Sequence, residues 1–160
     1  MEVVARCHLG LPVVIAVPPH LDDGTPFPTR YWLTCPLAIH RIGRIESRGG
    51  VAAADGRVAA DAVFRDRFDA AMTRYATERD ALIDAGAPPS RPSGGVGGSH
   101  QGVKCLHAHY ADHAAGRDNP VGEVTGHAIE PLDCSLPCVA VVDGAVGRNP
   151  AWRRPKQTPR

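Results

Sequence analysis

Proline and glycine interrupt this chain at short intervals and limit the length of any helix or strand that it can form. The 160 residues include 15 prolines and 17 glycines. Proline lacks a backbone hydrogen-bond donor, and glycine favours turns and the ends of helices. In residues 18–29 (PPHLDDGTPFPT), four prolines and an Asp-Gly turn exclude a helix. We therefore expect short elements joined by many loops, within one domain of ordinary size.

Charge and hydropathy exclude several functional classes. The formal net charge is +1, so the chain lacks the basic excess that marks a nucleic-acid-binding surface. The sequence shows no apolar run of about 18 residues that could span a membrane, and no secretory signal. We expect a cytoplasmic protein that contacts neither membrane nor nucleic acid, and the question of a protein partner stays open.

Hydrophobic periodicity predicts an α+β fold. Residues 2–7 and 12–17 are rich in β-branched side chains and predict a hairpin. Further strands are predicted at 31–34 and 138–142, and helices at 36–48, 59–85, 103–115 and 119–130. The expected fold is a small sheet of about four strands (N-terminal hairpin, third strand, C-terminal strand) packed with about four helices. We place this domain at residues 1–143 and expect the basic residues 144–160 to form a disordered tail.

Several motifs occur in an order that resembles a known bacterial family. They are Arg6-Cys7 with Gly10 and Pro12, then DGTPFPT at 23–29, YWLTCP at 31–36, VKCLHAHYA at 103–111 and NPVG at 119–122. Together they are similar to the domain-of-unknown-function family five hundred and one, which occurs mainly in actinobacteria. The resemblance covers about residues 3–142 and implies no particular reaction.

Thiols and imidazoles are the groups in this chain best suited to chemistry. Five cysteines in a reducing cytoplasm fit a disulfide framework poorly. If the third strand lies beside the first and runs in the same direction, Cys7 and Cys35 fall at one edge of the sheet. Cys105 lies in the first turn of a predicted helix, where the helix dipole favours a thiolate. We expect Cys7, Cys35, Cys105 and one of His107 and His109 to bind a metal ion, with zinc favoured.

The spacing of the ligands leaves some choices open. Cys105 and His109 share a helix face at the i, i+4 spacing, whereas His107 reaches the ion only from an irregular first turn. Cys134 and Cys138 form a second half-site that could join Cys105 and a histidine. An iron–sulfur cluster is a less favoured cofactor, and the simplest alternative is that the cysteines pack in the core without a metal.

Two functions follow from a metal site. A closed site with four protein ligands is typical of an interaction or regulatory module. An open coordination position, completed by a polar loop with Asp22 and Asp23 or by Lys104, is typical of a metal-dependent hydrolase. A thiol-redox protein ranks third, because no C-x-x-C motif supplies a resolving cysteine. The sequence identifies no catalytic residue and leaves open whether the protein is an enzyme.

Overall fold

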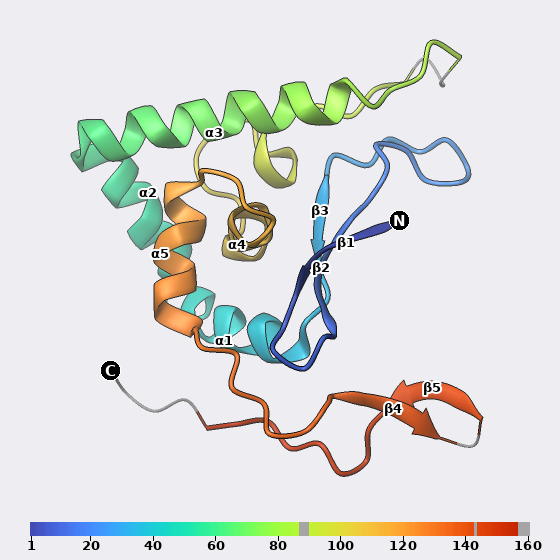
Figure 1. Ribbon diagram of the computed structural model, residues 1–160. Coiled ribbons are helices and arrows are strands. Elements are labelled where there is room, and N and C mark those ends of the chain that lie inside the picture. The colour runs from blue at the N-terminus through green and yellow to red at the C-terminus, as the bar shows by residue number, and fades with distance from the viewer. Residues whose placement is uncertain (87–89, 143, 157–160) are drawn as a thin grey trace.

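A three-stranded antiparallel sheet forms one side of the molecule (Figure 1). The computed structural model describes residues 1–86, 90–142 and 144–156. The predicted hairpin is confirmed: β1 (Glu2–Arg6) pairs with β2 (Pro12–Ala16). The third strand, β3 (Tyr31–Leu33), pairs with the other edge of β2, so it does not lie beside β1 as expected. Because β1 and β3 are both antiparallel to β2, they still run in the same direction.

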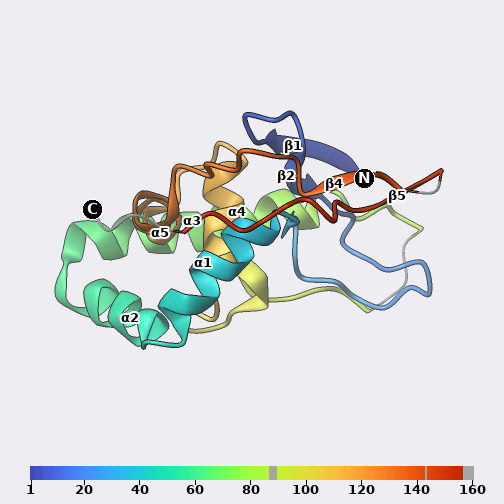
Figure 2. The ribbon, with the colours of Figure 1, turned by 90° about the horizontal axis from the view of Figure 1, so that it is seen from below.

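The helices surround one central helix (Figures 1 and 2). In Figure 1, α4 lies in the middle of the molecule, with α3 above it, α1 below it and the sheet to its right. The helices are α1 (Pro36–Glu46), α2 (Gly50–Ala60), α3 (Ala62–Asp80), α4 (Leu106–Ala114) and α5 (Pro120–Ile129), and a short 3₁₀ helix, η1 (Val96–Gly98), precedes α4. Two small antiparallel sheets and these helices confirm an α+β fold.

The helix predicted at 59–85 is observed as the shorter α3, which begins only at Ala62 because the chain breaks at Asp61. The Asp61 backbone is extended, and its side chain accepts a hydrogen bond of 3.0 Å from the Phe64 amide. This is an N-cap, so α3 begins immediately after it and α2 occupies the preceding residues. The two helices meet at this cap, and α3 presents Phe64, Phe68 and Tyr75 to the core.

The C-terminal residues depart from the expected tail. β4 (Val139–Val142) pairs with β5 (Ala145–Arg148) in a separate two-stranded sheet, and not with the N-terminal sheet. Trp152 is only 5% exposed and belongs to the core. A basic composition suggested disorder, but apolar burial of one aromatic ring and strand pairing outweigh it. Residues 157–160 of the predicted tail lie outside the described residues.

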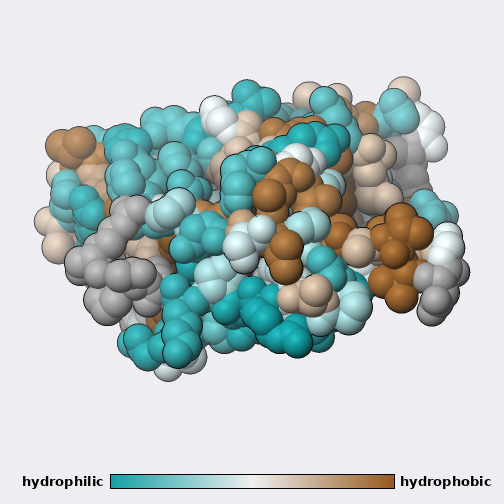
Figure 3. All heavy atoms as spheres, turned by 60° about the horizontal axis from the view of Figure 1, so that its bottom comes forward, coloured by the Kyte–Doolittle hydropathy of each residue, from teal (hydrophilic) through white to brown (hydrophobic). Residues whose placement is uncertain are grey.

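The β4–β5 hairpin leaves apolar side chains uncovered. Val141 and Val146 are 72% and 78% exposed. Figure 3 shows hydrophobic side chains gathered beside the turn of this hairpin. No helix within the described residues combines the length and apolar character needed to cross a membrane.

Candidate metal centre

The first turn of α4 meets the last turn of α1, and a carboxylate joins them. Cys105 is the N-cap residue of α4, and its own side chain makes no capping hydrogen bond. Instead, Glu46 at the end of α1 accepts a hydrogen bond of 2.6 Å from the Leu106 amide through Oε1. A carboxylate is unfavourable at the C-terminal end of its own helix and favourable at the N-terminal end of another. The contact with α4 therefore explains why an acidic residue ends α1.

His107 is held by hydrogen bonds at both ring nitrogens. Its Nε2 lies 3.0 Å from the carbonyl oxygen of Ile39, and its Nδ1 lies 3.2 Å from Glu46 Oε2. A backbone carbonyl only accepts hydrogen bonds, so Nε2 carries a proton and donates it. Nδ1 is then the nitrogen that is able to bind a metal ion.

The pKa of His107 reflects these neighbours. It is raised from its ordinary value of 6.5 to about 9. The largest cause is a hydrogen bond between the ring and the Cys105 sulfur, burial opposes it, and the Ile39 carbonyl and the Glu46 charge add to the rise. Without a metal ion, His107 is therefore an imidazolium at neutral pH, and an arriving cation would replace the Nδ1 proton.

Three donor atoms converge at this point. One ligand atom each from Glu46, Cys105 and His107 lie within 4.8 Å of one another. Carboxylate oxygen, thiolate sulfur and imidazole nitrogen are the three donor types that zinc accepts. The side chains of Glu46 and His107 are each 25% exposed, so solvent reaches the group. In the described part of the chain, this is the one group of three such residues with that spacing.

A family model matches residues 3–127 of the chain, and the family is described as a protein of unknown function, DUF501. The chain belongs to the DUF501 family. This confirms the resemblance predicted from the motifs. No curated protein and no solved structure matches the chain. The matched segment includes Glu46, Cys105 and His107, so all three residues of the group lie in the part that defines the family.

His109, the other histidine considered as a ligand, lies in the core of this DUF501 protein. It is fully buried, stacks on Phe68, and its Nδ1 is 3.1 Å from Asn119 Oδ1. Burial lowers its pKa to about 4, so the ring is neutral. Asn119 also donates to the buried Asp112 carboxylate, which pairs with Arg74 at 2.6 Å. His109 thus belongs to a polar network inside the core, while His107 belongs to the group with Cys105.

The other residues considered from the sequence lie elsewhere. Asp23 accepts a hydrogen bond of 2.9 Å from the Thr25 amide, and this bond lowers the Asp23 pKa, as in an Asx turn. Lys104 donates to the Gly97 carbonyl at 3.2 Å. Neither these residues nor Asp22, Cys7 and Cys35 belong to the group of three donors that the described residues form.

Glu46 is the residue of the group that sequence reasoning missed. Its only local signal is its position, because an acidic side chain in the last turn of a helix opposes the helix dipole. Ile39 and Glu46 are seven residues apart and share a face of α1, which is how both reach one imidazole. The pairing depends on how α1 and α4 pack, and no sequence spacing reports that.

Proposed function

We propose that this protein binds one transition-metal ion, with zinc favoured, through Glu46, Cys105 and His107. The observation that carries the proposal is the convergence of three donor atoms from α1 and α4 within 4.8 Å. Hydrogen bonds with neighbouring backbone groups also hold two of the three ligand side chains in place. Leu106 holds Glu46 Oε1 and the Ile39 carbonyl holds His107 Nε2, which leaves Oε2 and Nδ1 directed at one point.

The donor set favours zinc over harder ions. Magnesium and calcium prefer oxygen ligands, whereas the group offers one sulfur, one nitrogen and one oxygen. Zinc binds thiolate, imidazole and carboxylate at about 2.0–2.3 Å in tetrahedral geometry. Three protein ligands leave the fourth tetrahedral position for water or another small molecule.

An open position favours an active metal ion over a purely structural one. Structural zinc sites usually have four protein ligands, and catalytic sites have three and a water. When bound, the ion would lower the pKa of that water and polarise a carbonyl or phosphoryl oxygen. The partial exposure of Glu46 and His107 supports access for a small molecule. Of the two functions expected from the sequence, this supports the hydrolase type over the interaction module.

Cobalt substitution tests the site directly. Cobalt(II) added to the metal-free full-length chain should show a thiolate charge-transfer band and the visible absorption of a tetrahedral ion. We expect Cys105→Ala to lose the thiolate band of this site, and Glu46→Gln and His107→Gln to weaken cobalt binding at least tenfold. His40→Gln is the matched control, because His40 lies on α1 outside the group. Equal cobalt binding by all four variants would refute the proposal.

A second candidate function uses the same residues without a metal. The hydrogen bond between Cys105 and His107, with Glu46 on the ring, is also the arrangement of a nucleophilic thiol beside a histidine and a carboxylate. In that case iodoacetamide should alkylate Cys105 of the metal-free protein at neutral pH much faster than the other thiols, and His107→Gln should slow it at least tenfold. Protection of Cys105 by zinc would show that the ion occupies this site first.

A further inference from the structure

Four of the five cysteines lie near the other end of α1. Cys7 follows β1 in the tight turn to β2, and Cys35 is the N-cap residue of α1. Since β1 and β3 run in the same direction, the residues that follow them lie at the same end of the sheet. Cys7 and Cys35 therefore lie at the same end of the sheet, although β1 and β3 are its two opposite edge strands. An α-helix rises about 1.5 Å per residue, so α1 separates Cys35 from Glu46 by roughly 16 Å.

Hydrogen bonds bring the segment with Cys134 and Cys138 to this end. Arg41, a buried residue of α1, donates to the carbonyls of Ile129 and Pro131 at 2.7 and 2.6 Å, and pairs with Asp133 at 2.7 Å. His8 Nε2 lies 2.8 Å from the carbonyl oxygen of Cys134. The residues after α5 are thus tied both to α1 and to the β1–β2 turn.

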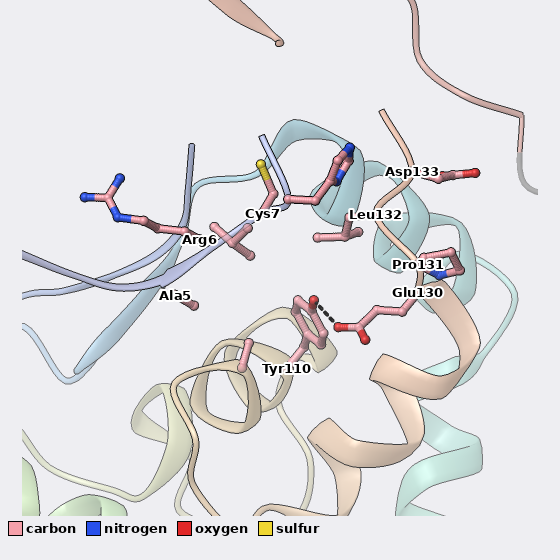
Figure 4. A pocket seen from close by; sticks show the side chains of 11 residues that line it. Ala5, Arg6, Cys7, Tyr110, Glu130, Pro131, Leu132 and Asp133 are labelled. Carbon is pink, nitrogen blue, oxygen red and sulfur yellow. Dashed lines mark hydrogen bonds between the residues drawn. The ribbon is translucent and has the colours of Figure 1, made fainter. Parts of the chain in front are cut away.

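The close-up in Figure 4 shows the two sides of this junction. Cys7 lies on the turn after β1, with the start of α1 behind it, and Leu132 points toward it from the segment after α5, whereas the Asp133 side chain points away. Between them is a cavity of about 640 Å³, and Tyr110 donates a hydrogen bond of 2.7 Å to Glu130 on its floor. Cys7 therefore lines a space that lies between the β1–β2 turn, α4 and the segment after α5.

The four cysteines all pack against the hydrophobic core. Cys35 is only 8% exposed, and the other three cysteines pack partly buried against the same core. Burial raises the pKa of Cys35, the amides of Leu37 and Ala38 oppose the rise, and Cys134 and Cys138 add to it. Burial also raises the pKa of Cys138, with Cys134 and Cys7 adding to it. Cys138 also lines a cavity together with Thr34 and Pro36, the two residues that flank Cys35 in the chain.

We propose that Cys7, Cys35, Cys134 and Cys138 bind a second transition-metal ion, zinc, in a closed site of four thiolates. Cys134 and Cys138 are separated by three residues, which is within the usual spacing of a zinc-binding cysteine pair. The ion displaces the thiol protons to solvent and joins the β1–β2 turn, the start of α1 and the segment before β4. With four protein ligands the site has no open position, so its role is structural.

Closing the site requires the cysteine side chains to move. Among the described residues, no three of these sulfur atoms lie within 4.8 Å of one another. A change between staggered χ1 rotamers moves a cysteine sulfur by roughly 3 Å. The proposal therefore requires rotation of these side chains, together with adjustment of the β1–β2 turn and of the 134–138 segment, when the ion binds. This second site uses none of the residues of the Glu46 group, so the two proposed sites can be tested independently.

The test is the zinc content of the tag-free, full-length chain by mass spectrometry under non-denaturing conditions. We expect two zinc ions per wild-type chain. Cys134→Ser with Cys138→Ser should remove one and leave the ion that depends on Cys105, whereas Cys105→Ala should remove the other. A wild-type chain with a single ion that follows Cys105 would overturn the proposal. So would iron with labile sulfide, or a mass lower by two hydrogens that marks a disulfide.

Thiol reactivity keeps the proposal testable if the double variant does not fold. In the native Cys105→Ala chain, all four remaining thiols should resist N-ethylmaleimide at least tenfold better before a zinc chelator is added than after it. Reaction rates that do not change with the chelator would show that these thiols hold no ion. The single variant Cys134→Ser should expose the other three thiols together, because a shared ion protects them as a set.

Discussion

The two ends of α1 bring candidate metal ligands together in different ways. At the C-terminal end, Glu46 and His107 are fixed by hydrogen bonds to the backbone of the opposite helix before any ion binds. At the N-terminal end, four thiols come from a turn, a helix cap and a loop, and hydrogen bonds fix the chain around them but not the sulfurs. The first arrangement is organised for binding in advance, whereas the second becomes ordered by binding. We therefore expect the two ends to respond differently when metal is removed.

The largest expected difference is in stability. At free zinc about a thousandfold above the dissociation constant, a bound ion stabilises the folded chain by about 4 kcal/mol. The four-thiolate site should bind more tightly, so chelation should lower the free energy of unfolding mainly through Cys134 and its partners. Urea titrations with and without chelator should show this loss in the wild type and in Cys105→Ala, and not in Cys134→Ser. If Cys105→Ala abolishes most of the loss of stability on chelation, the Glu46 group and not the four-thiolate site is the more stabilising one.

Arg41 offers a way to damage only the N-terminal end of α1. Replacing it with methionine leaves the carbonyls of Ile129 and Pro131 without their donor, so we expect a loss of about 2–4 kcal/mol in unfolding free energy. Freeing the 130–138 segment should also expose the four thiols to maleimide. Arg44→Met, an exposed arginine on the same helix, is the control. Cobalt binding by Cys105 should be unchanged in Arg41→Met; a parallel loss there would mean that the two ends are coupled.

A smaller expected difference between the two ends of α1 is the pH dependence that His107 gives to zinc binding and to stability. His107 has a folded-state pKa of about 9, raised from 6.5, so below pH 9 a metal ion must displace its proton. Displacement of this proton should therefore raise zinc affinity at the Glu46 group by about tenfold per pH unit between pH 6.5 and 8, and by less as the pH approaches 9. In the metal-free protein the sign is opposite: the protonated ring stabilises the fold fully below pH 6.5, and this contribution is lost as pH rises through 9. Competitive zinc titrations and urea titrations measure the two trends, and His107→Gln should remove the second.

The smallest expected effect concerns the cap of α4. Glu46→Ala removes the acceptor for the Leu106 amide and should cost about 1 kcal/mol of metal-free stability, the usual value of a helix cap. Glu46→Gln keeps an oxygen at that position and should lose less than half as much. Thermal unfolding of both variants in the presence of chelator separates the capping role from metal binding. Equal losses would assign the effect to the charge rather than to the hydrogen bond.

Local signals predicted much of the fold. The hairpin, α1, α4 and α5 were correct to within a few residues, because strand alternation, proline at the start of α1 and the Asn119 cap are properties of adjacent residues. Helix α2 was not predicted, because its sequence is mainly small and polar and none of its residues is buried, so its apolar face is weak. Pairing of β4 with β5 was missed because five lysines and arginines after residue 147 dominate the composition there.

The candidate sites were harder to predict than the elements that carry them. Cys105 and His107 are two residues apart, so their proximity follows from sequence alone. Glu46 meets them only because α1 and α4 pack with the end of one against the start of the other. The sequence suggested one site that combined Cys7 and Cys35 with Cys105. The length of α1 separates these residues, and neither Cys7 nor Cys35 joins the group around Cys105.

The distribution of the four thiols along the chain has a consequence during synthesis. Roughly a hundred residues separate Cys35 from Cys134, and ribosomes add about 5–20 residues per second. Cys7 and Cys35 are therefore synthesised at least about 5–20 seconds before Cys134 and Cys138. During that interval the nascent chain presents two neighbouring thiols that can react with oxidants or capture a metal ion from the surrounding pool. The order in which the ribosome makes these residues thus determines when the N-terminal end of α1 is most vulnerable.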